Sequence, residues 1–440
     1  MHRILFIQPT QYGRDGKLCK QGRLYLPGLV FPLLSAMTPP DWEVAVRIEV
    51  IDGIDFEDTA DIVGIGTMGF TIFRALEIAE EFKKRGKLVV LGGYMASIMV
   101  TEVSKYVDAV VVGDAETSYP RLLKDFEQTG CIQSVYSEPV DSLANIPLPH
   151  YEILTQKRIG TMLPVQAARG CPNSCSFCSI ACLYKGRYMP RPVKEVARDI
   201  AEVKRLGFRE FYLIDDNIIG NPAYFLSLCK TISKLKMKWS TQCSLLIADN
   251  PNLLAAACAS GASMMSFGVE SLNQEGLDKL NKAWLDVREH RRRINTISRS
   301  GILVSTEMII GTDGDTLESI RATADFILEC HVPIPRFYIL TPMPGSPLFD
   351  EYKREGRLLT EDFSLYDGSM AVFKPVHMSA EELTEAYWEL SRRVFSITSI
   401  LARTLFNPLF FRNPSKHLFA LIVNLHYRAY VKRKVPPNIF

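Results

Sequence analysis

The chain has 440 residues, of which 47% are hydrophobic and 23% are charged. This balance suits two or three globular domains, and it excludes a disordered chain, a collagen and a coiled-coil rod. The 51 Lys and Arg residues against 49 Asp and Glu residues leave a net charge of +2, so no global basic field favours a nucleic-acid partner.

The ten cysteines are too few for a small disulfide scaffold in a chain of this size. The N-terminus has no apolar run that ends in a small-residue cleavage site, which argues against a signal peptide. No stretch reaches the roughly 18 apolar residues of a membrane-spanning helix. We therefore expect a cytoplasmic protein with reduced thiols, in which clustered cysteines indicate metal binding or catalysis.

Short apolar segments alternate with an amphipathic pattern over residues 1–140, which predicts a doubly wound parallel sheet with helices on both faces. Ligands of such sheets bind at the carboxyl ends of the strands. Glycines there let a backbone approach a ligand, but they also make ordinary turns, so a sheet without a ligand is an equal alternative. The expected strands are 3–7, 44–50, 61–67, 87–91 and 109–113, and the expected helix is 73–85.

A segment rich in proline, residues 141–160, is predicted to be a linker. Six further strand and helix units follow over residues 161–350, and they predict a partial (β/α)6 barrel of the TIM type, with its site at the C-terminal strand ends. The expected strands are 162–168, 210–214, 239–245, 263–268, 303–310 and 336–340, separated by helices at 192–206, 222–235, 251–260, 275–300 (broken near 283) and 316–330.

The C-terminal region, residues 351–440, is predicted to be mainly helical. Ser379 with Glu382 three residues later indicates a capped helix start. The residues beyond 396 mix Leu, Phe and Ile with Lys and Arg. Two interpretations remain open: an interfacial helix at a membrane surface, or a helical pair packed on the barrel with a solvated face.

The strongest chemical signal is the loop that carries Cys171, Cys175 and Cys178 in the spacing CxxxCxxC, directly after the first barrel strand. Three thiolates on one loop can bind three irons of an iron–sulfur cube and leave the fourth iron open. An open position can bind a substrate or cofactor. A structural zinc site is the competing interpretation; it would take four ligands, with Cys182 as the fourth thiol.

This loop, with Phe177 before its last cysteine, resembles the hallmark of the radical S-adenosylmethionine (radical SAM) superfamily. The resemblance extends over most of residues 161–350. It is carried by Asp215-Asp216-Asn217 after the second strand, by the segment 266–271 with Leu280-Asn281-Lys282, by Ile309-Ile310-Gly311, and by the segment 341–348. It implies a 4Fe-4S cluster on the three cysteines and reductive cleavage of S-adenosylmethionine to methionine and a 5′-deoxyadenosyl radical.

The resemblance also implies residues that bind S-adenosylmethionine. Phe177 would pack near the adenine or merely pack the loop, and Asp216 would accept from the methionine ammonium or cap the helix near Pro222. Glu270 and Ser271 would meet the ribose hydroxyls or the carboxylate, and Gln242 would bind the cofactor or satisfy the backbone. The complete implied set is Phe177, Asp216, Gln242, Gly268, Glu270, Ser271 and Thr341.

The N-terminal domain resembles the cobalamin-binding domain of the class B radical SAM enzymes. Position 95 is Met where the family often has His, and no Asp-x-His-x-x-Gly occurs, so a His ligand to cobalt is not expected. The implied cobalamin-binding residues are Gly64, Thr67, Gly92, Gly93, Tyr94 and Glu116.

The region around 356–396 resembles members that act on hydrophobic polycyclic substrates, such as hopanoid methylases and bacteriochlorophyll-pathway enzymes. The first hypothesis is cobalamin-dependent methyl transfer to an unactivated carbon of a lipid or tetrapyrrole, with an electron donor such as flavodoxin or ferredoxin. The alternatives are a carbon–carbon bond-forming, ring-contracting or cyclase enzyme without functional cobalamin, a methylthiotransferase, and a non-catalytic metal-binding module. A methylthiotransferase would need further cluster cysteines in the N-terminal domain, which offers only Cys19 and Cys131.

Overall fold

The computed structural model describes residues 2–13 and 16–437. The chain divides into two compact units, one formed mainly by residues 1–164 and the other mainly by residues 165–361 and 365–439. Each unit is built around one six-stranded sheet. This confirms the predicted α/β class, with an N-terminal parallel sheet, a partial barrel and a helical C-terminal region.

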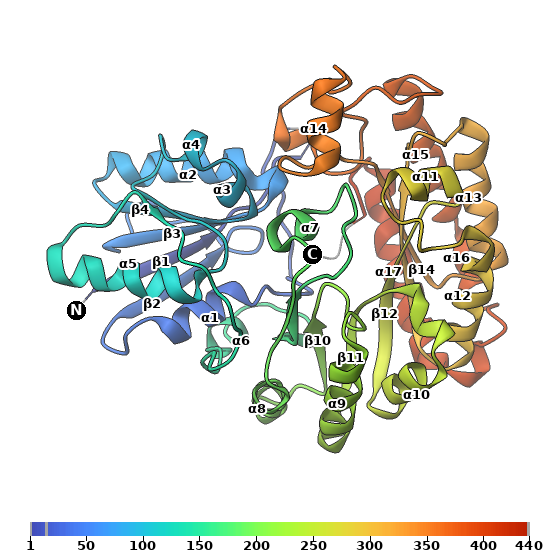
Figure 1. Ribbon diagram of the computed structural model, residues 1–440, viewed down its shortest axis with the longest axis horizontal. Coiled ribbons are helices and arrows are strands. Elements are labelled where there is room, and N and C mark those ends of the chain that lie inside the picture. The colour runs from blue at the N-terminus through green and yellow to red at the C-terminus, as the bar shows by residue number, and fades with distance from the viewer. Residues whose placement is uncertain (1, 14–15, 438–440) are drawn as a thin grey trace. The chain divides into compact units, whose positions relative to one another are not determined.

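The first unit is a fully parallel sheet with the strand order β2-β1-β3-β4-β5-β6. Helix α2 packs on β3 and β4, whereas α1 and α5 pack against each other (Figure 1). The strands are β1 (Arg3–Gln8), β2 (Glu43–Ile48), β3 (Ile62–Thr67), β4 (Leu88–Gly93), β5 (Ala109–Val111) and β6 (Val135–Tyr136), and the helices are α1 (Val30–Met37), α2 (Ile72–Lys84), α3 (Tyr94–Ile98), α4 (Val100–Val103), α5 (Ala115–Thr129) and α6 (Glu152–Thr155).

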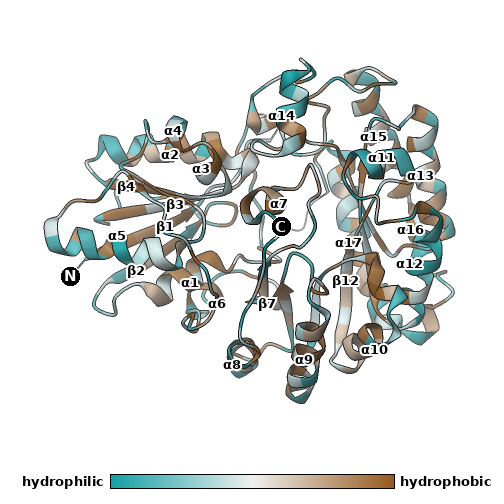
Figure 2. Cartoon of the chain, viewed as in Figure 1, coloured by the Kyte–Doolittle hydropathy of each residue, from teal (hydrophilic) through white to brown (hydrophobic). Residues whose placement is uncertain are grey.

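Apart from Arg3, Gln8 and Thr67 at their ends, strands β1, β3 and β4 consist of apolar residues and glycine, in line with the brown colour of Figure 2, because both faces of the sheet are covered by helices. The predicted linker at 141–160 packs on this unit. The His150 amide donates to the Pro32 carbonyl over 3.0 Å, and Lys157 forms an ion pair with Asp52 at 2.6 Å. Several of its apolar side chains, such as that of Tyr151, are buried. This burial explains why the segment belongs to the first compact unit.

The second unit orders its strands β14-β13-β12-β11-β10-β7, which is the sequential order of a partial barrel. The antiparallel hairpin of β8 (Ala168–Gly170) and β9 (Tyr188–Pro190) follows the first barrel strand. The barrel strands are β7 (Met162–Gln166), β10 (Glu210–Ile214), β11 (Lys238–Cys243), β12 (Ala262–Glu270), β13 (Leu303–Ile310) and β14 (Ile334–Ile339). Strands β10 and β13 match the predicted ranges residue for residue.

The helices of the second unit begin where the sequence carries capping residues. The Asn221 side chain accepts from the Tyr224 amide at the start of α9, and Ser379 and Glu382 form the predicted capping box of α15. The predicted break near 283 separates α11 from α12. The helices are α7 (Ser179–Tyr184), α8 (Val193–Arg205), α9 (Pro222–Ile232), α10 (Pro251–Ala259), α11 (Gln274–Lys279), α12 (His290–Arg299), α13 (Leu317–Glu329), α14 (Pro347–Arg354), α15 (Ala380–Val394), α16 (Ile397–Arg403) and α17 (Pro414–Lys432).

A fully buried arginine, Arg403, joins the C-terminal helices to the barrel. Its guanidinium donates to the Val332 carbonyl at 2.9 Å, the Val394 carbonyl at 2.9 Å and the Asn424 side-chain oxygen at 3.0 Å. These acceptors are neutral, and burial lowers the pKa of Arg403 to about 9. One side chain therefore satisfies buried oxygens from α15, α17 and the segment before β14.

We predict that Arg403→Ala lowers the free energy of unfolding by about 3 kcal/mol or more, because several buried oxygens lose their donor. Urea unfolding of the purified chain measures this loss. The control is Arg392→Ala, whose exposed pair with Glu385 should contribute less than about 1 kcal/mol. Equal losses in the two variants would contradict the role assigned to Arg403.

Candidate functional site

The cysteine loop, residues 171–178, begins at a glycine that no other residue can replace easily. Gly170 ends β8 with a φ of +82°, and a Cβ there would lie 2.1 Å from the Arg187 carbonyl oxygen. The backbone therefore turns away from the hairpin and places Cys171 at the start of the loop. Cys178 precedes α7 and closes the loop, since its amide donates to the Cys175 carbonyl at 3.2 Å.

Two segments distant in sequence hold this loop. The Asn281 side chain donates to the Ser174 carbonyl at 2.7 Å, and the Ser176 amide donates to the Leu280 carbonyl at 3.1 Å. The Leu348 amide donates to the Ser176 carbonyl at 3.0 Å. The segments that resembled family motifs after the fourth and sixth barrel strands thus contact the cysteine loop directly.

The three thiols lie in a poorly solvated environment. Burial raises the pKa of Cys175 to about 12 and also raises the pKa values of Cys171 and Cys178. The Lys282 ammonium opposes this rise at Cys175 and Cys178. A thiolate is therefore unfavourable here unless a cation or a metal stabilises it, so this donor set suits an iron-bound state.

The thiols of the described loop 171–178 are not gathered around a single point. Within residues 2–13 and 16–437, no three His, Cys, Asp or Glu side chains converge on a point that could hold a single metal ion. Three thiolates that each bind a different iron of a cube need no such convergence. Cys182 lies one helical turn later, and its thiol donates to the Cys178 carbonyl at 3.1 Å.

A buried ion pair lies beside the loop. Glu270 is 7% exposed and has a φ of +61°, where the pairing of β12 with β13 shifts by one residue. Its carboxylate meets the Lys282 ammonium at 2.5 Å. Burial opposes the Lys282 charge, but Glu270 together with Cys175 and Cys178 outweighs burial, and the pKa of Lys282 is raised. The strained backbone turns the carboxylate toward the ammonium instead of along the strand.

Gly268 makes room for this pair, because a Cβ at that position would lie 2.3 Å from a Glu270 carboxylate oxygen. The Lys282 ammonium also lies 5.8 Å from the centre of the Phe177 ring and 5.5 Å from that of Trp284. The structure thus brings Phe177, Gly268 and Glu270 together with Lys282. Lys282 lies in a segment that resembles a family motif, but the sequence pattern predicted no role for its side chain.

The carboxylates after β10 have separate partners. The Gly170 amide donates to Asp216 at 2.8 Å, and the Tyr188 hydroxyl donates to Asp215 at 2.8 Å. Asp216 does not cap the helix near Pro222, because Asn221 does so. The negative charge of Asp216 raises the pKa values of Cys171 and Cys178, which places Asp216 near the thiols.

The remaining predicted positions lie at or near the C-terminal strand ends with their own contacts. Gln242 is exposed on β11. The Ser271 hydroxyl is buried and accepts from the Asn273 amide at 3.0 Å, and the Thr341 hydroxyl donates to the Ile339 carbonyl at 2.9 Å. Each hydroxyl keeps acceptor capacity for a bound ligand.

A second charged cluster on the barrel strands was missed by the sequence analysis. The Ser266 hydroxyl donates to Glu307 at 2.7 Å, and the Arg336 guanidinium lies 3.1 Å from the same carboxylate oxygen. Burial raises the pKa of Glu307, and Arg336 opposes the rise. Alternation along each strand could have placed Glu307 and Arg336 on a face of the sheet. The sequence does not reveal, however, that the register of β13 and β14 sets these two residues opposite each other.

In the first unit, the predicted cobalamin residues divide into packing positions and edge positions. A Cβ on Gly64 would lie 2.8 Å from the Phe6 ring, so Gly64 serves the packing of two neighbouring strands. Gly93 has a φ of +101° and allows the close approach of Thr67, whose hydroxyl donates to the Gly92 carbonyl at 2.9 Å.

The strand ends nearby are open. Gly113 follows β5 with a φ of +74°, is exposed, and has no atom within 4 Å of the place of a Cβ. Tyr94 begins α3, and Glu116 lies in the first turn of α5. The carboxyl edge of this sheet therefore offers glycine backbone and two helix starts to a bound group.

The chain is similar to known proteins over most of its length. Residues 165–327 match the family model of the radical SAM superfamily. The chain is 29% identical over 357 residues to the bacteriochlorophyllide d C-12(1)-methyltransferase of Chlorobaculum tepidum, which covers 79% of this chain and 78% of that protein. It is 24% identical over 350 residues to the hopanoid C-2 methylase of Rhodopseudomonas palustris, with 77% of this chain and 66% of that protein covered.

The fold also matches a solved structure along nearly its whole length. The radical S-adenosylmethionine methyltransferase TsrM from Kitasatospora setae, with cobalamin and a 4Fe-4S cluster bound, superposes with a TM-score of 0.66 and 17% identity, and 99% of both chains is covered. At this identity the likeness establishes the fold. Together, the comparisons confirm the family resemblance seen in the sequence.

The buried carboxyl group of Asp215 predicts a pH effect on stability. Burial raises the pKa of Asp215 to about 7 against opposing hydrogen bonds from the Asn217 amide and the Tyr188 hydroxyl. Between about pH 4 and pH 7 the folded chain then holds a proton that the unfolded chain has lost, so Asp215 destabilises the fold increasingly as the pH rises. Asp215→Asn should remove a slope of at most about 1.4 kcal/mol per pH unit.

Urea unfolding of the metal-free wild type and Asp215→Asn across this pH range measures the difference. The wild type should lose stability relative to the variant as the pH rises toward 7. Parallel pH profiles of the two chains would contradict the raised pKa.

Proposed function

We propose, from the premise that this chain belongs to the radical SAM superfamily, that it transfers a methyl group to an unactivated carbon of a hydrophobic polycyclic substrate with the help of cobalamin. The observation that carries the proposal is the convergence of the loop 171–178, the Glu270–Lys282 pair and Asp216 at one end of the barrel. A thiol trio next to both a cation and carboxylates suits a zwitterionic ligand on an iron cluster.

Cys171, Cys175 and Cys178 are the residues that would hold the 4Fe-4S cluster. When bound and reduced, the cluster supplies the electron that cleaves S-adenosylmethionine to methionine and a 5′-deoxyadenosyl radical. The protein supports it with the Lys282 ammonium, which offsets the negative charge of the thiolates. The burial of Cys175 and the partial burial of Cys171 and Cys178 also limit side reactions with water.

The charged groups beside the loop would orient S-adenosylmethionine. Asp216 and Glu270 can accept from its ammonium or its ribose hydroxyls, and Lys282 can bind its carboxylate. Because Glu270 and Lys282 already pair, neither charge is left uncompensated before the ligand binds. Phe177, Gln242, Gly268, Ser271 and Thr341 complete the proposed binding set.

The first unit is the proposed cobalamin-binding domain. Its support is the exposed glycine edge at Gly93 and Gly113, together with the starts of α3 and α5. Glycines without a Cβ allow a flat ring to approach the backbone closely. We assign Gly64, Thr67, Gly92, Gly93, Tyr94 and Glu116 to this domain's ligand set or its supporting packing.

The names of the relatives support the proposed substrate class. One is named as a bacteriochlorophyllide methyltransferase and another as a hopanoid methylase, so we propose a tetrapyrrole or polycyclic lipid substrate here. The reaction would also require an electron donor such as flavodoxin or ferredoxin. A hydrophobic substrate favours a site of action near a membrane surface, reached by peripheral contact of the C-terminal region.

We predict that Cys175→Ala abolishes formation of 5′-deoxyadenosine, because the cluster loses one of three protein ligands. The measurement is anaerobic reconstitution with iron and sulfide, reduction, and chromatography of the S-adenosylmethionine products. The matched control is Cys182→Ala, one turn beyond the loop, which should keep its iron and its product. If each of the two single variants, Cys175→Ala and Cys182→Ala, lost its iron, the result would favour a site with four thiol ligands instead.

A titration of the full chain with hydroxocobalamin tests the first unit. We predict that Gly113→Leu weakens binding about tenfold or more, since a side chain would fill the open strand edge. The control is Gly130→Leu, which has a similar φ of +68° and equally open surroundings but lies at the C-terminal end of α5. Wild-type protein that binds no cobalamin would favour the cyclase or bond-forming alternative.

A further inference from the structure

The outer face of helix α17 is an unusual surface. The inner face of α17 buries Ala420, Val423, Asn424, Tyr427 and Val431. Leu418, Ile422 and Leu425 nevertheless point the other way and are exposed, with Ile422 at 67%. Their spacing of four and three residues places them on one side of the helix. The helix is therefore apolar on both sides, although only one side packs on the protein.

Further apolar side chains extend this surface beyond the stripe. Phe411 is 93% exposed just before the helix, Phe406 is exposed in the same connection, and Phe419 lies beside Leu418 on the helix. Large exposed apolar side chains that gather on one short segment are typical of an interaction site. We refer to Phe406, Phe411, Leu418, Phe419, Ile422 and Leu425 as the α17 outer face.

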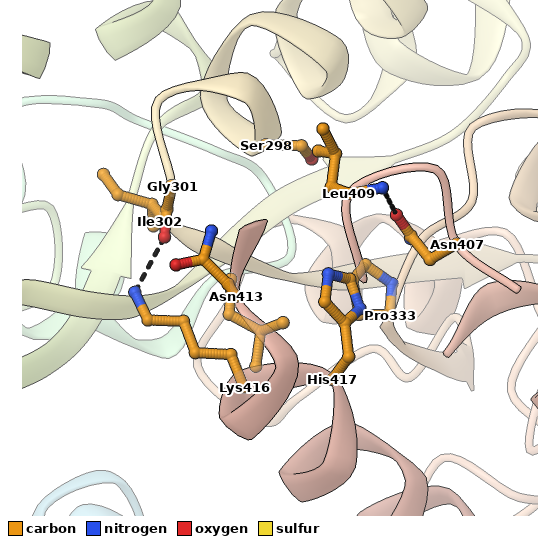
Figure 3. A pocket seen from close by; sticks show the side chains of 10 residues that line it. Ser298, Gly301, Ile302, Pro333, Asn407, Leu409, Asn413, Lys416 and His417 are labelled. Atoms are coloured by element: carbon orange, nitrogen blue, oxygen red, sulfur yellow. Dashed lines mark hydrogen bonds between the residues drawn. The ribbon is translucent and has the colours of Figure 1, made fainter. Parts of the chain in front are cut away.

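The start of this helix is fixed to the barrel. The Lys416 ammonium donates to the Gly301 carbonyl at 2.7 Å and to the Ser263 carbonyl at 3.0 Å, and Figure 3 shows Lys416 directed at Gly301, beside Asn413 and His417. These carbonyls precede or begin the strands β13 and β12. The outer face is therefore held outward by the fold and does not depend on a loose tail.

The segment that carries the outer face has charged side chains of a single sign, although Glu385 of the neighbouring helix α15 interacts with Lys434 at its end. Residues 397–437 contain no Asp or Glu. Lys432 and Arg433 follow Ala429 by three and four residues, so they continue the exposed side of the helix at its end, while Arg412 is exposed before its start. The exposed cations of this segment are Arg412, Lys432, Arg433 and Lys434, whereas Arg403 is buried and Lys416 and Arg428 are partly buried against backbone carbonyls.

We propose that the α17 outer face docks on the surface of a membrane that contains anionic lipids. Apolar side chains flanked by Lys and Arg match the acyl boundary and the negative headgroups respectively. In the described part of the chain, no helix has the length and apolar character needed to cross a bilayer. The contact is thus one in which the helix lies in the interface plane and keeps its inner face on the barrel.

The same observations disfavour other occupants. A second copy of the chain in a two-fold contact would bring two acid-free cationic segments together, which costs several kcal/mol in like-charge repulsion at an interface. A nucleic acid would meet the cations but would leave the side chains of Leu418, Ile422 and Leu425 without apolar partners. An anionic membrane satisfies both the charge and the apolar stripe.

Co-sedimentation of the full-length, metal-free chain with vesicles tests the proposal. The vesicles are phosphatidylcholine alone or phosphatidylcholine with about 30% phosphatidylglycerol. Wild-type protein should bind the anionic vesicles about tenfold more tightly than the neutral ones, and added salt should weaken the binding. Since the assay needs neither the cluster nor a substrate, a failure of vesicle binding can be distinguished from a failure of methyl transfer.

Paired variants locate the contact. Phe411→Ser with Ile422→Ser should weaken vesicle binding about tenfold, and Lys432→Gln with Arg433→Gln should remove most of the preference for anionic lipid. The matched control is Leu359→Ser with Val376→Ser, two exposed apolar residues elsewhere in the same unit, which should bind as the wild type does. An unchanged thermal midpoint in each variant shows that the fold is intact.

Three results would overturn the proposal: equal binding to neutral and anionic vesicles, wild-type binding by the Phe411→Ser and Ile422→Ser variant, or absence of vesicle binding. If the protein does not bind vesicles, light scattering of the wild type and of this variant measures whether the chain forms dimers. If the wild type forms a dimer that this variant dissociates, the outer face is an interface between copies of the chain.

Discussion

Burial of Cys175 and partial burial of Cys171 and Cys178 on one short loop is the constraint on which the rest of the second unit depends. Burial disfavours the thiolate at each of Cys171, Cys175 and Cys178, so the loop is chemically suited to a bound metal cluster and poorly suited to solvent. The neighbouring structure compensates for this in two ways. Hydrogen bonds from Asn281 and Leu348 fix the loop backbone, and the Lys282 ammonium adds positive charge where the thiolates need it.

The Glu270–Lys282 pair links the fold to the chemistry. Glu270 occupies a left-handed backbone conformation at a shift in strand register, which costs free energy that a merely structural strand end would avoid. The result is a carboxylate and an ammonium held beside the cysteine loop. Such a pair can exchange its internal contact for contacts to a zwitterionic ligand without leaving a buried charge alone. The strained residue, Glu270, therefore lies where the proposed zwitterionic ligand would bind.

The sequence predicted much of this architecture, because the relevant signals are local. The strands β10 and β13, the break between α11 and α12, and the capping box of Ser379 and Glu382 follow from apolar periodicity and capping chemistry. The cysteine loop was found from its spacing alone. The contacts that complete the site are not local. Lys282 forms an ion pair with Glu270, which lies at a shift in strand register, and Glu307 forms an ion pair with Arg336 on the neighbouring strand. Periodicity does not reveal such pairs.

Other differences have the same origin. The segment 141–160 has the composition of a linker, yet Tyr151 and Lys157 attach it to the first unit through tertiary contacts. Gly64 follows the expected pattern of a ligand-binding strand end, but the Phe6 ring explains its lack of a side chain. A glycine in a sequence does not indicate whether a ligand or a neighbouring ring occupies the space, and only the packing distinguishes these cases.

The central claim is that a cluster on this loop keeps one iron open to S-adenosylmethionine. The most direct measurement is electron paramagnetic resonance of the anaerobically reconstituted, reduced full chain with and without S-adenosylmethionine. The account predicts the signal of a reduced 4Fe-4S cluster whose line shape changes when the ligand is added, because the ligand binds iron. A cluster signal that is indifferent to S-adenosylmethionine, or a chain that retains zinc and no iron, would contradict it.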